Sequence, residues 1–250
     1  MARTFTYAAL VLRVRPSGES NREAWFLTAE EGILRATVFG GPKSKLRAHA
    51  APFNRGTLWI YHDPVRDSRK VTDFDVRSWR PGIRERYERS AAASAVVETI
   101  LAAHGGGGDW PAALNLADET LEALAEAEET LCPRILLRFL WNWADILGCR
   151  PDPGRCASCA CEAPADGVLW YIRREGTLLC PSCAERTPGA GERLPVGPGA
   201  RRWLEAAESP DLSLFTRYAP DAASFGQAKT LVTEVLAGAF GTRLSGWDGL

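Results

Sequence analysis

Residues 156–183 read CASCACEAPADGVLWYIRREGTLLCPSC and contain two Cys-x-x-Cys pairs. Cys156 and Cys159 form the first pair, and Cys180 and Cys183 form the second after an interval of twenty residues. This doubled spacing is typical of a four-cysteine zinc site. Four thiolates complete a tetrahedron around the ion and leave no position for water, so we predict one structural Zn²⁺ and no metal catalysis.

The sequence between the two pairs indicates how they meet. A hairpin formed by Val168–Ile172 and Thr177–Leu179 would bring the pairs together. Two alternatives remain, in which the cysteines are redox-active dithiols or free surface thiols, although no thioredoxin-like βαβ pattern surrounds them. In addition, Cys161 with Cys159 can replace the first pair, but a one-residue gap makes a poorer metal-binding turn.

Segments rich in proline and glycine flank the cysteines. Pro151–Gly154 leads into the cluster and Pro188–Pro198 leads out of it, so we predict a zinc-finger insertion over residues 151–194. The odd number of cysteines, seven, favours metal or free thiols over disulfides in a reducing compartment. Arg13 and Arg15 interrupt the N-terminal apolar stretch, so no signal peptide is expected and the protein is predicted to be cytoplasmic.

The N-terminal third alternates between β-rich runs and turn residues. The five runs are Phe5–Arg15, Glu23–Thr28, Ile33–Phe39, Thr57–Tyr61 and Lys70–Trp79. Breaks of turn chemistry, such as Pro16-Ser17-Gly18 and Gly40-Gly41-Pro42, separate them. Five short strands in a segment of this size favour a small barrel, so we predict a five-stranded OB-like β-barrel over residues 1–80. An SH3-like barrel remains an alternative.

A helical pattern follows Pro81-Gly82, where the apolar period changes from two to about 3.6. Helices are expected over residues 83–104, from near Asp118, over 133–148, over 200–208 and over 225–239. In the first helix, the side chains expected to line the buried face are Ile83, Tyr87, Ala91, Ala95, Val97 and Leu101. We therefore predict an α+β multidomain protein in which an all-α helical domain, residues 81–150 and 195–250, contains the zinc-finger insertion.

Charge is divided unevenly along a chain whose formal net charge is −1. Residues 1–90 contain seventeen Lys and Arg against ten Asp and Glu, whereas residues 91–150 contain three against nine. The densest basic stretch is the glycine-rich turn at residues 39–47, FGGPKSKLR, in which backbone N–H groups and cations can meet a phosphate chain together. The residues predicted to contact phosphate are Arg35, Lys43, Lys45, Arg47 and Arg55.

Aromatic side chains in the same region can stack on bases. The candidates are Tyr7, Trp25, Phe39, Phe53, Trp59 and Tyr61. The interior of a small barrel needs most of its aromatic residues, so only a minority are expected to face a nucleic acid. A basic surface can also serve solubility alone, so nucleic-acid binding is a hypothesis at this point.

Motifs of common enzymes do not fit this sequence. The glycine-rich turn lacks the Gly-x-x-x-x-Gly-Lys-Ser/Thr order of a P-loop, no two histidines follow a His-x-x-x-His pattern, and no serine lies in a Gly-x-Ser-x-Gly elbow. No apolar run approaches the roughly 18 residues that cross a bilayer. We therefore predict a non-enzymatic protein without a membrane segment.

Several weaker motifs occur together in a specific order. In the barrel region they are ALVLR at residues 9–13, Gly18-Glu19, Phe26-Leu27-Thr28 with Gly32, Gly40-Gly41-Pro42-Lys43-Ser44 and Pro52-Phe53. Farther along they are Phe139–Gly148, the two Cys-x-x-Cys pairs with Glu175–Leu179 before the second, and Arg243-Leu244-Ser245. This set resembles the RecO family of bacterial DNA-repair proteins over nearly the whole chain, and the cysteines match the zinc-containing variant of that family.

The resemblance implies a function that composition does not show. It implies a recombination mediator that binds single- and double-stranded DNA, anneals complementary strands, works with RecR, and helps RecA to displace the single-strand-binding protein SSB. It also implies a nucleoid-associated place in the cytoplasm. We expect the acidic tail of SSB to bind a groove among the C-terminal helices with Arg201 or Arg202 at its rim. The alternative is a zinc-containing protein-interaction scaffold without direct DNA binding.

Overall fold

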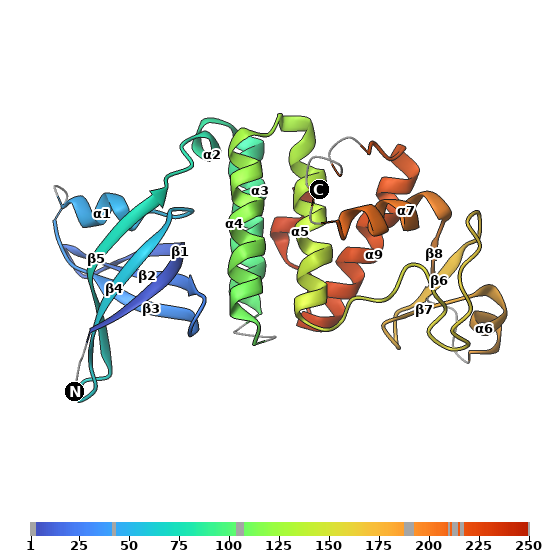
Figure 1. The fold of residues 1–250 in the computed structure, drawn as a ribbon, viewed down its shortest axis with the longest axis horizontal. Helices are drawn as coiled ribbons and strands as arrows, with labels where there is room; N and C mark the ends of the chain where they lie inside the picture. The colour runs from blue at the N-terminus through green and yellow to red at the C-terminus, as the bar shows by residue number, and fades with distance from the viewer. Residues whose placement is uncertain are drawn as a thin grey trace. The chain divides into compact units, whose positions relative to one another are not determined.

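Figure 1 shows the protein as a computed structural model. The structure describes residues 4–41, 44–103, 108–187, 193–209, 211, 215 and 218–249. The chain divides into two compact units, Met1–Glu129 and Thr130–Leu250. The first unit contains a β-barrel and helices, and the second contains helices and a small sheet. Among the described residues, no helix has the length and apolar character needed to cross a membrane.

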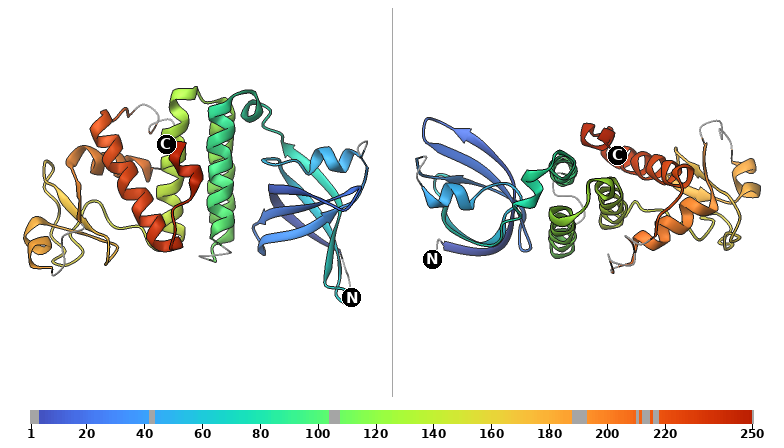
Figure 2. Two further views of the ribbon diagram at one scale, coloured as in Figure 1. Left: turned by 180° about the vertical axis from the view of Figure 1, so that it is seen from behind. Right: turned by 90° about the horizontal axis from the view of Figure 1, so that it is seen from above.

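The N-terminal strands close into a barrel with the order β1-β2-β3-β5-β4. The strands are β1 (Thr4–Ser17), β2 (Asn21–Thr28), β3 (Gly32–Val38), β4 (Arg55–Asp63) and β5 (Ser68–Ser78). Neighbouring strands are antiparallel except β3 and β5, which pair in parallel at Thr37 with Lys70 and at Val38 with Val71. The predicted five-stranded OB-like barrel is confirmed, and the blue-to-teal strands of Figures 1 and 2 trace it.

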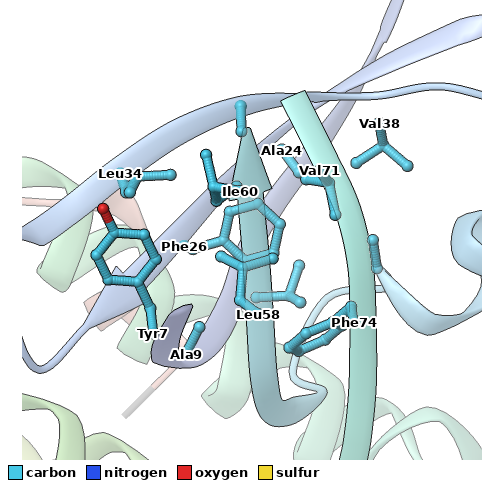
Figure 3. Close-up of a cluster of buried hydrophobic side chains, with 13 residues drawn as sticks. Tyr7, Ala9, Ala24, Phe26, Leu34, Val38, Leu58, Ile60, Val71 and Phe74 are labelled. Atoms are coloured by element: carbon cyan, nitrogen blue, oxygen red, sulfur yellow. The ribbon is translucent and has the colours of Figure 1, made fainter. Parts of the chain in front are cut away.

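Alternating residues of each strand fill the barrel interior. The buried core comprises Tyr7, Ala9, Val11, Ala24, Phe26, Leu34, Ala36, Val38, Ala50, Leu58, Ile60, Val71 and Phe74. Figure 3 shows Phe26 of β2, Leu58 of β4 and Phe74 of β5 pointing into the same interior. Phe26 and Phe74 meet edge to face with their ring centroids 5.9 Å apart. The period-two pattern of the sequence therefore becomes a closed apolar core.

Helices cover part of the outer barrel surface. α3 (Tyr87–Ala102) and α4 (Trp110–Glu126) lie side by side in Figures 1 and 2, and both contact β1. Leu10 and Leu27, paired across β1 and β2, are fully buried although they do not belong to the interior core. Gly32 permits a close helix contact: its φ of 69° favours glycine, and a Cβ there would lie 2.4 Å from the Trp110 ring.

The first helix predicted from the sequence is broken in the structure. Arg86 has an extended backbone that separates α2 (Gly82–Glu85) from α3. This break resets the helical phase, so Tyr87 is 81% exposed and Ala91 also faces solvent, whereas Ile100 is buried. The predicted buried face is therefore wrong at Tyr87 and Ala91.

The second helix, α4, begins at Trp110 and not near Asp118. The Asp109 side chain caps it by accepting a hydrogen bond from the backbone N–H of Ala112, and Pro111 occupies the first turn. Asp109 and Pro111 are the start signals of this helix, and they come directly after a run of glycines in the sequence. The prediction relied on the apolar pattern alone and therefore placed the start of the helix too late.

The second unit combines helices with a three-stranded sheet that contains the cysteines. After η1 (Glu129–Leu131), its elements are α5 (Cys132–Ile146), β6 (Leu169–Ile172), β7 (Thr177–Leu179), α6 (Pro181–Arg186), β8 (Arg193–Val196), α7 (Pro198–Ala207), α9 (Ala222–Phe240) and η3 (Ser245–Gly249). The predicted hairpin is confirmed as the antiparallel pair β6 and β7. β8 was not predicted: it pairs with the other edge of β6, in a segment whose proline and glycine content suggested a linker.

Arg201 fixes the cysteine-rich segment to α7 from within the second unit. It is 5% exposed and donates hydrogen bonds to the carbonyl oxygens of Pro153, Pro164 and Gly167 at 2.7–2.9 Å. Its guanidinium donates to several loop carbonyls at once, which five N–H groups allow. Arg201 and Arg202 nevertheless line one cavity of about 500 Å³, so the expected groove with Arg201 or Arg202 at its rim stays a prediction. Arg202, the next residue, is exposed.

Arg80 has a similar role in the first unit. Its side chain is 2% exposed and pairs with two acidic residues of α4, Asp118 and, at 2.9 Å, Glu122. It also donates a hydrogen bond to the Phe53 carbonyl at 2.8 Å. The segment that follows β5 is therefore tied both to α4 and to the loop before β4.

Arg80→Met is expected to destabilise the first unit by about 2 kcal/mol, because it removes charge-assisted hydrogen bonds from a buried position. Asp118 and Glu122 remain in contact with water, which keeps the loss below that of a fully buried ion pair. Hydrogen exchange at the amides of β5 and α4 measures the change. Arg66→Met, at an exposed hairpin position, is the control, and equal protection in both variants would contradict this role.

Candidate nucleic-acid interface and metal centre

The outer surface of β1, β2 and β3 carries basic side chains around one tryptophan. Arg13 pairs with Trp25 across β1 and β2, and Trp25 pairs with Arg35 across β2 and β3. Because Trp25 alternates with the core residues Ala24 and Phe26, it projects away from the barrel interior. We call this surface the basic face, and its members are Arg13, Arg15, Trp25 and Arg35.

Two guanidinium groups of the basic face lie near the Trp25 ring. The Cζ atoms of Arg15 and Arg35 are each 5.7 Å from the centre of the Trp25 ring, a distance that gives a cation–π interaction. Arg35 also pairs with Glu23 at 2.5 Å, yet its side chain is 65% exposed. The arrangement holds a flat ring and two cations close together at the surface.

The short helix α1 (Lys45–His49) adds two of the predicted cations to this region. Arg47 lines a cavity of about 270 Å³ together with Arg15 and Arg22, so the structure brings Arg47 next to the basic face. Lys45 is exposed on the same helix. Lys43, the remaining cation of the glycine-rich turn, lies outside the described residues.

Arg55 has a different environment from the other predicted cations. Its Nε atom lies 3.6 Å from the Asp118 carboxylate, and its Nη1 donates to the carbonyl oxygens of Ala9 at 3.4 Å and Gly56 at 3.1 Å. Burial lowers the pKa of the Arg55 guanidinium, and Asp118 opposes that shift. Arg55 lines a cavity with Glu30 and Asp118, and the structure does not bring it together with the basic face.

The other aromatic candidates differ in their surroundings. Tyr7 belongs to the core, where burial and a hydrogen bond to a carboxylate raise the pKa of its hydroxyl to about 12. Phe39 is 44% exposed, and the Lys70 ammonium lies 5.3 Å from its ring centre. Trp59 pairs across β4 and β5 with the exposed Asp73, whose charge repels phosphate. The half-buried candidates are Phe53, Trp59 and Tyr61.

Three arginines of this region were missed by the sequence interpretation: Arg13, Arg15 and Arg22. They precede the glycine-rich turn and look like ordinary strand and turn residues when read alone. The register of the β1–β2 hairpin is the signal that could have found them. Pairing Ser17 with Asn21 at the turn sets Arg13 opposite Trp25.

The four cysteines predicted to bind a metal meet in the second unit. The Sγ atoms of Cys156, Cys159, Cys180 and Cys183 all lie within 4.8 Å of one another. Those of Cys159 and Cys180 are 3.9 Å apart, which matches the separation of about 3.8 Å between sulfurs that each lie about 2.3 Å from one zinc ion. The four-cysteine cluster is confirmed, and it can hold a metal ion.

The thiol pKa values differ widely within the cluster, and a bound cation would let all four thiols be deprotonated together. Burial acts to raise the pKa of the Cys156 thiol, but backbone N–H groups of Cys159 and Cys180 lower that pKa to about 6. The backbone N–H of Cys183 lowers the pKa of the Cys180 thiol, but desolvation and the neighbouring thiols outweigh it and raise that pKa to about 12. Four like charges this close repel one another, and a divalent cation removes the conflict because it deprotonates the thiols that coordinate it.

A cavity of about 760 Å³ lies beside the cysteine cluster within the second unit. Its lining includes the apolar side chains Tyr171, Leu178 and Val235 and the basic side chains Arg155, Arg173 and Arg174. Arg155 and Arg173 are each paired with a carboxylate, whereas Arg174 is exposed and forms no ion pair with any residue that the structure describes. We call this cavity the groove. It offers an apolar floor and an available cation to a ligand.

Comparison with known proteins relates these features to a family. The family model for the N-terminal part of recombination protein O matches residues 1–78, and the model for its C-terminal part matches residues 84–244. The chain belongs to the RecO family. The first match covers the barrel, and the second covers the helices together with the cysteine cluster and the groove.

Individual relatives agree with this assignment. The chain is 29% identical to the DNA repair protein RecO of Rubrobacter xylanophilus over 193 residues. The aligned region covers 76% of this chain and 75% of that protein. The chain is also 26% identical over 207 residues to the DNA repair protein RecO of Bacillus subtilis, spanning 82% and 77%. The resemblance seen in the sequence is confirmed, and with it a role in DNA repair.

Cys180→Ser is expected to abolish metal retention and to lower hydrogen-exchange protection mainly within residues 151–187, because metal binding and folding of this segment are coupled. Metal content per chain and exchange mass spectrometry measure the two effects. Cys149→Ser is the matched control, since Cys149 lies outside the cluster and donates a hydrogen bond to the Ala144 carbonyl that serine can keep. Full protection of the segment in a metal-free Cys180→Ser protein would contradict the coupling.

Proposed function

We propose that this RecO protein is a non-enzymatic recombination mediator that binds single- and double-stranded DNA on the basic face of its barrel. The observation that carries the proposal is the outward-facing Trp25 ring with the guanidinium groups of Arg15 and Arg35 each 5.7 Å from its centre. An aromatic ring stacks on a base of any identity, and guanidinium groups contact phosphate without regard to sequence. The expected binding is therefore sequence-independent and weakens steeply with salt.

The DNA backbone is expected to continue from the basic face toward α1. The cavity that Arg47 shares with Arg15 supports this path, and so does the exposure of Lys45. Lys43, two residues before Lys45 in the chain, belongs to the same proposed contact set. Arg55 is expected to contribute least among the predicted cations, because its side chain is only 17% exposed, against 65% for Arg35.

Strand annealing requires proximity and charge neutralisation but no covalent chemistry. Cations that neutralise the phosphates of one strand reduce the repulsion that a complementary strand meets, and base pairing then proceeds by itself. Membership of the RecO family supports the remaining steps of the proposal, in which the protein acts with RecR and helps RecA to load on DNA covered by SSB.

We assign one structural Zn²⁺ to the cysteine cluster. An all-sulfur set of four donors suits zinc and leaves no coordination position for water or substrate. The ion would hold the turn at residues 156–159 to the turn at residues 180–183 and so brace the insertion. Its proposed contribution is to folding and not to DNA chemistry.

The groove is our proposed site for the acidic, apolar-tipped tail of SSB. Acidic residues of the tail would meet Arg174, and its apolar tip would contact Tyr171 and Val235. The cavity with Arg201 and Arg202 is the other candidate for the tail, and of these two arginines only Arg202 is available, because the Arg201 side chain is buried. The groove would also give the second unit a role in binding a partner protein.

The proposed roles follow a division of the chain into three parts. We propose residues 1–80 as the DNA-binding barrel and residues 81–150 with 195–250 as the helical domain, of which α3 and α4 lie in the same compact unit as the barrel. Residues 151–194 form the zinc-finger insertion. We place the protein in the cytoplasm, in association with the nucleoid, because its proposed ligand is chromosomal DNA.

Trp25→Ala is expected to weaken single-stranded DNA binding by the full chain about tenfold, because one stacked base loses a contact of about 1–2 kcal/mol. Lys45→Ala and Arg47→Ala should each reduce the slope of log affinity against log salt by about 0.7, the value for one phosphate contact on a single strand. Fluorescence anisotropy of a labelled oligonucleotide across a salt series measures both quantities.

Trp59→Ala and Arg66→Ala are the matched controls for the aromatic and the basic substitutions. Trp59 lies opposite Asp73, and Arg66 is exposed at the β4–β5 turn, so both variants should bind DNA like the native chain. If the native chain fails to bind DNA at low salt but still binds protein partners, the interaction-scaffold alternative replaces the DNA-binding proposal.

Arg174→Ala is expected to weaken binding of a synthetic SSB-tail peptide several-fold, because the peptide carboxylates lose the available cation of the groove. Isothermal titration calorimetry with the full chain measures the affinity. Arg66→Ala, exposed at the β4–β5 turn of the first unit, is the control. Equal affinity of the Arg174→Ala and native proteins would remove the groove from the account without affecting the basic face.

A further inference from the structure

A fifth cysteine lies beside the metal-binding cluster. The Sγ atom of Cys161 is 3.2 Å from the Sγ atom of Cys159, and both side chains are exposed. Cys161 is not a member of the mutually close set of four sulfurs. One proposed metal ligand therefore has a thiol neighbour that the site does not use.

The position of Cys161 is fixed by the backbone around the first cysteine pair. The backbone N–H of Cys156 donates to the Cys161 carbonyl at 3.0 Å, which closes the turn that contains Cys159. Arg155 and Glu162 then form a β-bridge, and their side chains form an ion pair at 3.3 Å. The approach of Cys161 to Cys159 thus belongs to an ordered turn.

The conformation between the two neighbouring thiols also brings them together. Ala160 has a φ of 57°, in the left-handed region that a residue with a side chain rarely adopts. This reversal of the chain lets residues 159 and 161 present their sulfurs to each other. Along an extended strand, residues two apart would share a face but lie farther apart.

We propose that Cys159 and Cys161 form a peroxide-sensitive thiol pair that disconnects one ligand from the metal site. In the reaction, two thiols and one hydrogen peroxide molecule give one disulfide and two water molecules. The two S–H bonds and the O–O bond break, the S–S bond forms, and the sulfurs are oxidised while the peroxide oxygens are reduced. The first step is oxidation of one thiol to a sulfenic acid, and the second thiol displaces water from it.

The consequence of this oxidation rests on the proposed zinc site. Once Cys159 is in a disulfide, three sulfurs remain for the ion, so the segment loses metal affinity and the folding energy coupled to it. Arg155 and Ala157 line the groove and belong to the same turn region, so peroxide would also disturb the groove. Reduction by a thiol would restore the ligand.

The test uses the full-length protein as purified with its metal. Hydrogen peroxide is added in the presence of a chromogenic zinc chelator, remaining thiols are blocked, and tryptic peptides are mapped by mass spectrometry. The peptide of residues 156–173 should then contain a Cys159–Cys161 disulfide, which has two hydrogen atoms fewer than the two free thiols. Cys156 in the same peptide should carry the blocking group, and zinc release should accompany the disulfide. Cys161→Ser should form no such disulfide and keep its zinc under the same exposure, whereas Cys149→Ser should behave like the native protein.

The possible outcomes separate this inference from the zinc assignment. Oxidation that links Cys156 to Cys159, or zinc release from Cys161→Ser as fast as from the native chain, would overturn it. If Cys161→Ser does not fold, the disulfide map of the native chain decides the question. If the purified protein holds no zinc, the zinc assignment fails, and the presence or absence of the Cys159–Cys161 disulfide still decides whether the thiol pair exists.

Discussion

Closure of the barrel sorts the side chains of the first unit, and the candidate interface depends on that sorting. The parallel pairing of β3 with β5 completes the ring of strands, so each side chain faces either the apolar core or the outside. Outward residues are covered by helices, as Leu10 and Leu27 are, or remain accessible, as the half-buried Trp25 and the exposed Arg35 do. A register slip of one residue would exchange the two sets and place cations in the core.

Arginine has two distinct uses in this protein. Arg80 and Arg201 are buried, and their guanidinium groups pair with carboxylates or bond to loop carbonyls. Arg15 and Arg35 are exposed and flank an aromatic ring. The first use stabilises each unit, and the second leaves charge available to a ligand. The basic excess of the N-terminal third therefore overstates the number of cations that can meet phosphate.

The parts of the fold that depend on neighbouring residues could be predicted from the sequence. The five strands follow from an apolar period of two, and the cysteine cluster follows from the spacing of its two pairs. The parts that depend on distant partners could not. β8 is defined by its pairing with β6, and the burial of Arg201 is defined by carbonyls far back in the chain. The basic face likewise required a hairpin register that brings Arg13 opposite Trp25.

Photo-crosslinking of the full chain to single-stranded DNA tests the central claim most directly, because it locates the contact and does not alter the protein. After ultraviolet irradiation and trypsin digestion, the account predicts that the main crosslinked peptide covers residues 23–35, which contain Trp25. Crosslinks confined to residues 56–66, which contain Trp59, or to peptides of the second unit would contradict the account, because the DNA would then bind away from the basic face.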